Sequence, residues 1–329
     1  MLGCTGATED EAMRSVCSRP SCALFPGQCT IVGGMRRPTS VEVMLLSAIV
    51  LWALNLTVSR YILTHGFQPL AFSTVRYGLA SLVFIVIAIG IERSLRIARR
   101  DCLLVGGAAL VLFVNQIGFV YALKTTSASV IALILAATPI FAALIGLAFG
   151  TEVLPRRFWL GAALSFAGVG LVALGATGQL GADAAGILYG ILTACTWAIY
   201  SILITPLMQH YSPVRISAIV LPLSWIGIAL AGLPQTQSQD WQLGWEVWAL
   251  LLFATLGPLV ITNILWFRSL DSIGASRATL AANLQPFLAA LFAVVLLGET
   301  IDVIQVAGGL LIGVGILAAR RRSPVSPGE

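Results

Sequence analysis

The chain alternates between long apolar stretches and short polar connections. A helix needs about 20 apolar residues to cross a bilayer, and ten stretches of the sequence reach roughly that length. Because the connections are short, the pattern predicts a compact bundle of membrane helices. The predicted spans are 42–63, 70–91, 102–122, 127–149, 157–176, 186–207, 215–233, 246–266, 274–297 and 302–319.

The composition leads to the same fold class. Of the 329 residues, 58% are hydrophobic and only 10% are charged, whereas soluble domains carry about 25% charged residues. We therefore predict an all-α membrane protein whose main partner is the lipid bilayer. Soluble functions are excluded, nucleic-acid binding among them, despite the net charge of +5.

Basic and acidic residues fall on opposite sides of the predicted bundle. With a cytoplasmic N-terminus, most arginines lie in inner connections, as membrane proteins prefer. Both termini are then cytoplasmic, in a multi-pass protein of the plasma or inner membrane. The inner residues are Arg36, Arg37, Arg93, Arg96, Arg99, Arg100, Arg156, Arg157, Arg215, Arg268 and Arg320 to Arg322; the outer acids are Asp183, Asp240, Glu246, Glu299 and Asp302.

The two ends of the chain lie outside the predicted bundle. Residues 1–40 have no helical period and no apolar run long enough for a signal peptide, so we predict a disordered extension. Their four cysteines match no zinc pattern and have no histidine nearby, so no metal site is predicted. Met35 opens a basic lead into the first helix and is an alternative start. Residues 320–329 form a basic cytoplasmic tail.

A long segment of the chain occurs twice. SASVIALILAATPIFAALIGLAFGTE at 127–152 aligns without a gap with GASRATLAANLQPFLAALFAVVLLGE at 274–299. Chance similarity between apolar helices would rarely repeat a proline, a glutamate and two glycines in register. The chain is therefore divided into two repeats, 41–176 and 186–319. The matched pairs are Pro139 and Pro286, Glu152 and Glu299, Gly161 and Gly308, and Gly168 and Gly315.

Each predicted repeat holds five helices. Since five is odd, the second repeat enters the membrane from the opposite side, which gives two inverted five-helix repeats. Inverted repeats are typical of secondary transporters, which expose one central site to each side in turn. This architecture predicts a substrate cavity near the membrane midplane, between the repeats.

The repeated prolines point to that cavity. Pro139 and Pro286 fall in the middle of the predicted spans 127–149 and 274–297, where each removes a backbone hydrogen bond and kinks its helix. A freed carbonyl in the membrane must face protein or a water-filled cavity. Neighbouring polar side chains are therefore candidates for substrate binding, although a kink that only shapes packing remains an alternative. These side chains are Thr138, Asn283 and Gln285.

Further polar and aromatic residues lie within the predicted spans. Trp52 and Asn55 share a helix face, as do Trp197 and Tyr200, and each pair is interpreted either as a substrate lining or as bundle core. Gln116 and Asn263, on repeat-related helices, are candidates for polar gates or for interhelical hydrogen bonds. An intramembrane arginine is costly and must be paired, face water or extend outward. For Arg76 the alternatives are thus a structural role, pairing with helix-end carbonyls or Glu299, and binding a substrate carboxylate.

Two glutamates follow the repeated helices. Glu152 and Glu299 precede the next predicted helix in each repeat, where the helix dipole favours a carboxylate. We expect them to cap those helices and tighten the hairpins, with a gating ion pair as the alternative.

Several chemistries lack their residues. No Asp or Glu lies at a predicted midplane, no nucleotide-binding G-x-x-x-x-G-K-[ST] motif occurs, and no nucleophile has a histidine near it in the membrane. These observations predict a carrier rather than an enzyme, without a cofactor. They favour a small neutral or zwitterionic substrate over a cation or a phosphate.

The motifs W-x-x-N (Trp52, Asn55) and V-R-Y-x-x-A (Arg76 to Ala80), with the repeated proline-glutamate blocks, resemble the EamA domains of the drug/metabolite transporter superfamily. The resemblance covers about 42–319 and implies a ten-helix inner-membrane carrier, often an exporter of amino acids or other metabolites. Small multidrug relatives carry an acid in the first helix where Asn55 stands here, which puts cationic drug export in doubt. Drug or amine efflux and a non-transporting scaffold or sensor remain alternatives, and a homodimer is a further partner to consider.

Overall fold

The structure is a computed structural model that describes residues 40–92, 95–148, 156–176, 184–273 and 284–319, with residues 150 and 282. Within these residues the chain is helical and has no strand. The predicted N-terminal extension, the alternative start at Met35 and the basic tail lie outside the described residues, so those predictions stay open.

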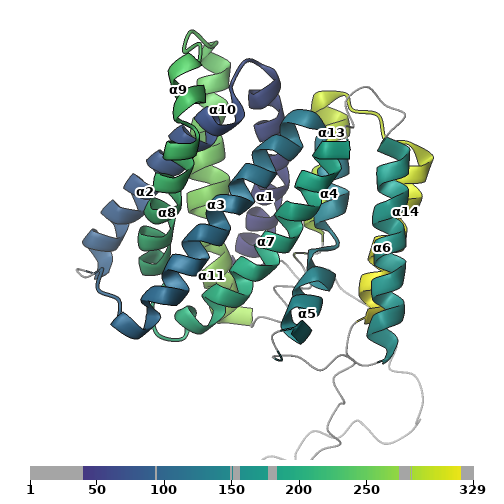
Figure 1. Ribbon diagram of the computed structural model, residues 1–329, viewed down its shortest axis with the longest axis horizontal. Helices are drawn as coiled ribbons and strands as arrows, with labels where there is room; N and C mark the ends of the chain where they lie inside the picture. The colour runs from purple at the N-terminus through teal and green to yellow at the C-terminus, as the bar shows by residue number, and fades with distance from the viewer. Residues whose placement is uncertain are drawn as a thin grey trace, which may run out of the picture. The chain divides into compact units, whose positions relative to one another are not determined.

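The helices of the two repeats follow one another along the chain (Figure 1). The first repeat contains α1 (Ser40–Thr64), α2 (Pro69–Glu92), the 3-10 helix η1 (Arg99–Asp101), α3 (Cys102–Thr125), α4 (Ala128–Leu135), α5 (Thr138–Ala148) and α6 (Arg156–Ala176). The second contains α7 (Ala184–Met208), α8 (Pro213–Ala231), α9 (Leu233–Ser238), α10 (Trp245–Thr255), the π-helix η2 (Leu256–Ile261), α11 (Thr262–Ile273), α13 (Gln285–Leu297) and α14 (Val303–Ala319).

Most of the described helices of 18 or more residues are also apolar enough to cross a membrane. Six described helices meet this condition, and α4 with α5 forms a seventh, broken span. α13 and α14 are apolar but shorter. The described part of the chain is therefore a multi-pass helical membrane bundle.

One of the predicted spans is not the continuous helix that we expected. The prediction of one helix over 127–149 is wrong, because α4 and α5 meet at a bend of 40°. The span 246–266 is continuous, but it passes from α10 through the π-helix η2 into α11. Of the span 274–297, the structure describes α13 from Gln285 onward, and most of the earlier residues lie outside the described residues. The short α9 was not expected.

Proline explains where two of these helices begin. Pro139 lies in the first turn of α5 and Pro286 in the first turn of α13, not in the middle of a helix. The first N–H groups of a helix have no intrahelical acceptor, so proline fits there without losing a bond. The sequence identified the break at Pro139 but placed it inside a longer helix, and most of the residues before α13 lie outside the described residues.

The two repeats meet directly where α6 packs against α14. Gly168 lies so close to Gly308 that a Cβ on either would be 2.6 Å from the other's carbonyl oxygen. A Cβ on Gly315 would be 2.5 Å from the carbonyl oxygen of Gly161. Residue numbers thus rise along one helix as they fall along the other, and the two helices are antiparallel, side by side in Figure 1.

A further contact between α6 and α14 joins two residues that the sequence repeat makes equivalent. The Ser165 hydroxyl donates to the carbonyl oxygen of Ile312, 147 positions later, which is the offset that relates Pro139 to Pro286. A residue can touch its own repeat mate across an antiparallel pair only near a twofold axis that relates the repeats. The packing of α6 on α14 is therefore the arrangement that an inverted repeat requires.

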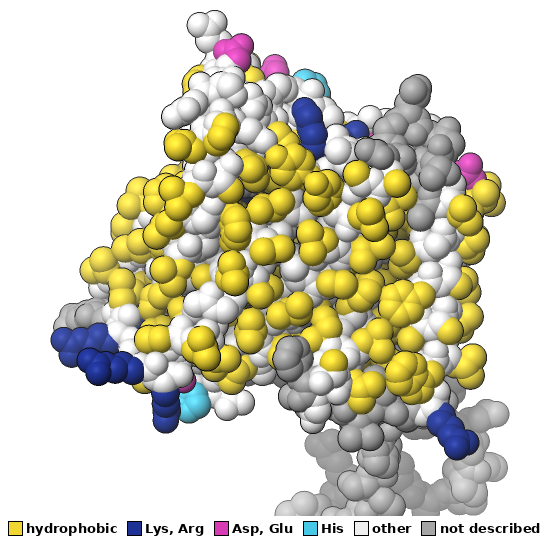
Figure 2. All heavy atoms as spheres, viewed as in Figure 1, with side chains coloured by type: hydrophobic (Ala, Val, Ile, Leu, Met, Phe, Trp, Pro, Cys, Tyr) yellow, Lys and Arg dark blue, Asp and Glu magenta, His cyan; other side chains and the backbone are white. Residues whose placement is uncertain are grey.

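The surface agrees with a membrane setting. Figure 2 shows hydrophobic side chains over the middle of the visible face, with most Lys and Arg side chains at the lower edge and most Asp and Glu side chains at the upper edge. Large apolar side chains such as Leu103, Ile91 and Trp245 are largely exposed. Exposed apolar surface on this scale is stable against lipid rather than water.

Candidate functional site

Arg76 lies at the centre of the most unusual polar arrangement in the described residues. Its side chain is only 4% exposed. Nη2 donates to Asn55 Oδ1 on α1 at 2.7 Å and to the carbonyl oxygen of Ala254 on α10 at 3.2 Å. The guanidinium carbon lies 5.7 Å from the centre of the Phe72 ring. Arg76 therefore links α1, α2 and α10 rather than extending outward. It takes part in neither of the two salt bridges found among the described residues, and Glu299 is not its partner.

A proline prepares the Ala254 carbonyl for this contact. In an α-helix that carbonyl accepts from the residue four positions later, which here is Pro258 and has no N–H. The helix continues past this point as η2, a π-helix. Such π segments occur often at functional sites. Arg76 thus supplies the donor that the proline removes.

The first-helix motif lies beside this arrangement. Trp52 packs against Trp266 of α11, with ring centres 5.1 Å apart. Asn55 is half-buried, and Ser59 also donates to its Oδ1, at 3.4 Å. The structure therefore brings together three of the residues singled out from the sequence, namely Trp52, Asn55 and Arg76, near α10 and α11 of the other repeat.

A second polar cluster joins α3 to α7. Asn115 Nδ2 donates to the carbonyl oxygen of Thr193 at 2.9 Å and to Thr196 Oγ1 at 3.0 Å. Gln116 Nε2 donates to Asn115 Oδ1 at 3.3 Å, while Gln116 Oε1 is buried with no hydrogen-bond partner. The cluster is interhelical bonding of the kind expected in membrane bundles, with one free acceptor.

The aromatic pair on α7 lies apart from the first-helix motif. Trp197 and Tyr200 share a helix face, with ring centres 5.5 Å apart. Trp197 is 42% exposed, and Tyr200 packs into the apolar cluster around Tyr77 of α2. The structure does not join this pair to Trp52.

The remaining sequence candidates make local contacts. Thr138 Oγ1 donates to the carbonyl oxygen of Leu135 at 2.6 Å, which replaces the N–H that Pro139 lacks. Asn263 Nδ2 donates to the carbonyl oxygen of Leu259 on its own helix. Gln285 is half-buried at the start of α13. Asn283 lies outside the described residues.

Glu299 caps a helix, but not the one expected. Its carboxylate accepts from the backbone N–H of Ala128 at 2.9 Å and of Ser129 at 3.0 Å, and from the Ser129 hydroxyl. These groups open α4 of the first repeat, so the prediction of a cap on the following helix is wrong. That role belongs to Asp302, which accepts from the backbone N–H of Ile304. Glu152 lies outside the described residues.

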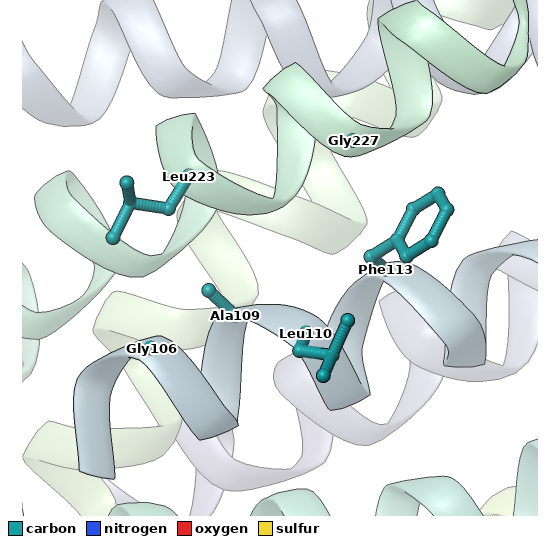
Figure 3. Close-up of a pocket in the computed structure, with 6 residues that line it drawn as sticks. All are labelled: Gly106, Ala109, Leu110, Phe113, Leu223 and Gly227. Atoms are coloured by element: carbon teal, nitrogen blue, oxygen red, sulfur yellow. The ribbon is translucent and has the colours of Figure 1, made fainter. Parts of the chain in front are cut away.

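The two cavities recorded in the described part of the chain lie elsewhere. The larger, about 250 Å³, is an apolar recess between α3 and α8 (Figure 3), lined by Gly106, Ala109, Leu110, Phe113, Leu223 and Gly227. The smaller, about 140 Å³, is lined by residues of α4, α13 and α14 with Ile301. Neither is lined by a predicted substrate residue, and Arg76 itself is buried.

Known proteins resemble this chain in both sequence and fold. The family model described as the EamA-like transporter family matches residues 39–174 and 184–321. The uncharacterized transporter YyaM of Bacillus subtilis (strain 168) is 24% identical over 288 residues, 85% of this chain and 93% of that protein. The uncharacterized transporter YdfC of the same organism is 28% identical over 59% of this chain and 62% of its own length. One solved crystal structure covers 86% of this chain and 97% of its own with a TM-score of 0.59 and 22% identity, which shows the fold alone.

Proposed function

The chain belongs to the EamA-like transporter family, and on this premise we propose that it exports small neutral or zwitterionic metabolites, such as amino acids. The family is one of membrane transporters and not of enzymes. In the proposed mechanism, ten membrane spans form two inverted five-helix repeats with both termini in the cytoplasm. The repeats move against each other so that a central site faces each side of the plasma or inner membrane in turn.

The antiparallel packing of α6 on α14 carries this proposal. Equivalent residues of the two repeats touch there, since Ser165 donates to Ile312. Close glycine contacts lie on either side of this bond, Gly168 against Gly308 and Gly161 against Gly315. A bundle with this symmetry has two related conformations, because each repeat can adopt the shape of the other. Exchange between the two shapes opens the centre to opposite sides of the membrane, which is what alternating access needs.

The substrate site is proposed near the midplane between the repeats. Support comes from the meeting of Trp52, Asn55 and Arg76 with α10 and α11 and from the free acceptor of Gln116. Gln285, at the start of α13, and Thr138, at the break between α4 and α5, belong to the same proposed lining. The absence of any acid at a predicted midplane favours neutral or zwitterionic substrates over cations.

Overexpression in a sensitive bacterial host tests the proposal. We expect the chain to raise resistance to toxic amino-acid analogues and not to cationic dyes. Trp52→Ala and Gln285→Ala should lower this resistance while membrane levels of the protein stay unchanged. Resistance to dyes alone would favour drug or amine efflux instead, and full activity of both variants would remove the central site from the account.

A further inference from the structure

Arg76 is a buried cation, and the groups that it contacts, the Asn55 amide, the Ala254 carbonyl and the Phe72 ring, are all neutral. Its two hydrogen bonds go to the Asn55 side-chain oxygen and to the Ala254 carbonyl, both from Nη2. The Nε–H group is buried and has no partner. A guanidinium offers five N–H donors in a planar fork, so the recorded bonds use only part of its capacity.

The structural role of Arg76 accounts for one of these contacts only. Donation to Ala254 replaces the bond that Pro258 cannot make, and a neutral donor such as glutamine could do the same. A carbonyl does not neutralise a positive charge. The charge of Arg76 therefore needs an explanation beyond this helix break.

The neighbouring helices supply no counter-charge. The acids of α1, α2 and α10 that the structure describes are Glu42, Glu92 and Glu246, which lie at the ends of those helices. Glu92 is paired with Arg215. Burying a charge in a low-dielectric interior is costly, and a partner of opposite charge offsets that cost more fully than neutral carbonyl groups do. No acid of the described residues therefore serves as the counter-ion of Arg76, and a bound ligand can supply it.

The Nε–H side of the guanidinium fits a carboxylate. Nε–H is free to donate to one carboxylate oxygen, and the neighbouring Nη2 can exchange one of its bonds, to Asn55 or Ala254, for a bond to the second oxygen, which completes a parallel pair of donors. Asn55 directs its Oδ1 to Arg76 and Ser59, which leaves its amide N–H groups as donors for the same ligand. Asn55 is half-buried whereas Arg76 is buried, so a ligand would approach along Asn55. The η2 segment beside Ala254 provides a deformable wall.

We propose that Arg76 binds the carboxylate of the transported molecule and that Asn55 positions it. This inference rests on the proposed function and narrows its substrate class to carboxylate-bearing metabolites, zwitterionic amino acids among them. Arg76 remains buried until a carboxylate reaches it, and the ligand supplies the counter-charge that the described helices around Arg76 do not.

The variant Asn55→Asp tests the missing counter-charge without any ligand. It places a carboxylate where Asn55 Oδ1 lies, 2.7 Å from Arg76 Nη2. We expect a higher thermal unfolding midpoint for the purified full-length chain in nanodiscs. A lower midpoint would show that Arg76 has no need of a negative partner and would overturn the proposal.

Ligand binding tests the carboxylate directly. The probes are leucine, phenylalanine and threonine, each compared with its amide and its amino alcohol, and binding is measured by thermal shift and by calorimetry. At least one acid should bind, while its amide and alcohol bind at least about 30-fold more weakly. Arg76→Gln should lose this preference, Arg76→Lys should keep part of it, and Asn55→Asp should weaken acid binding because its own carboxylate competes.

Arg60→Gln is the matched control. Arg60 is also a helix arginine bound to backbone carbonyls, those of Leu123 and Lys124, but it lies at the outer end of α1. It should keep the acid preference. Equal binding of acids, amides and alcohols, unchanged binding in folded Arg76→Gln, or a shift produced by chloride or phosphate alone would each overturn the proposal. If amino acids are transported but Arg76→Gln keeps the preference for acids, only this inference is contradicted. If none of the probes is transported, the proposed function itself is contradicted.

Discussion

At the scale of single residues, buried polar side chains in this protein donate chiefly to backbone carbonyls. Thr138 donates to Leu135, Arg76 to Ala254 and Asn115 to Thr193. In the first two cases a proline four positions after the acceptor has removed the helical donor. A carbonyl without a partner is costly in hydrocarbon, so these side chains stabilise breaks that the prolines create.

Asn115 and Gln116 allow this role to be measured. Asn115→Ala removes two bonds to α7, and we expect the free energy of unfolding to fall by about 1 kcal/mol, as for other interhelical bonds in membranes. Gln116→Ala removes a single long bond and should cost clearly less. The two free energies are compared by denaturant unfolding in mixed micelles. Equal losses would contradict the conclusion that Asn115 makes the main hydrogen bonds of this cluster.

The sequence identified individual residues of the site better than their contacts. Asn55 and Arg76 were both singled out, because amide and guanidinium groups are costly in a membrane span. Their bond to each other and the role of Ala254 were not predicted, since spacing along one helix does not show which face meets another. The Ala254 carbonyl had one available signal, Pro258 four residues later. For Trp266 and Thr196 the sequence offers no signal that distinguishes them from residues of the bundle core.

At the scale of helices, glycine determines how closely the repeats approach. Gly168 faces Gly308, whereas Gly170, two residues along the same helix, has no atom within 4 Å of an added Cβ. Small residues at contacts of this kind let membrane helices pack backbone to backbone.

Alanine substitutions test this packing. Gly168→Ala should lower the free energy of unfolding by about 2 kcal/mol, because the added methyl group forces α6 away from α14. Gly170→Ala should be neutral or slightly stabilising, because alanine favours the helix. Similar effects of the two changes would show that α6 and α14 do not pack through their glycines.

Glu299 offers a second test at this scale. Its carboxylate accepts two backbone bonds at the start of α4, and loss of such a cap costs about 1 kcal/mol. We expect Glu299→Ala, which removes both acceptor oxygens, to lower the free energy of unfolding by that amount. Glu246→Ala, at the exposed first turn of α10, is the control and should have little effect. Hydrogen exchange of the Ala128 and Ser129 amides should become faster in the Glu299 variant. Unchanged exchange of these amides would show that Glu299 caps α14 instead of α4.

Helix positions were predicted more reliably than helix continuity. The limits of α1, α2 and α14 agree with the predicted spans to within two residues, because apolar runs of membrane length are a strong signal. The break between α4 and α5 was predicted only as a kink, since a proline in the sequence does not show how far the helices on either side bend. The π-helix η2 has no pattern of hydrophobicity that would distinguish it.

At the scale of the whole chain, the sequence repeat and the structure support each other. The offset that aligns Pro139 with Pro286 also relates Ser165 to Ile312, which touch. This relation was within reach of the sequence because a proline, a glutamate and glycines recur in register. The substrate was not, because the residues that meet around Arg76 come from both repeats, and the sequence does not show which side chains of different helices meet.

Counterflow in proteoliposomes tests the central claim most directly. The purified chain is reconstituted with a mixture of unlabelled amino acids inside, and uptake of each labelled amino acid is followed. The account predicts saturable exchange of at least one amino acid, abolished in Arg76→Gln and retained in Glu246→Gln. Vesicles with folded, inserted protein that exchange no amino acid would contradict it.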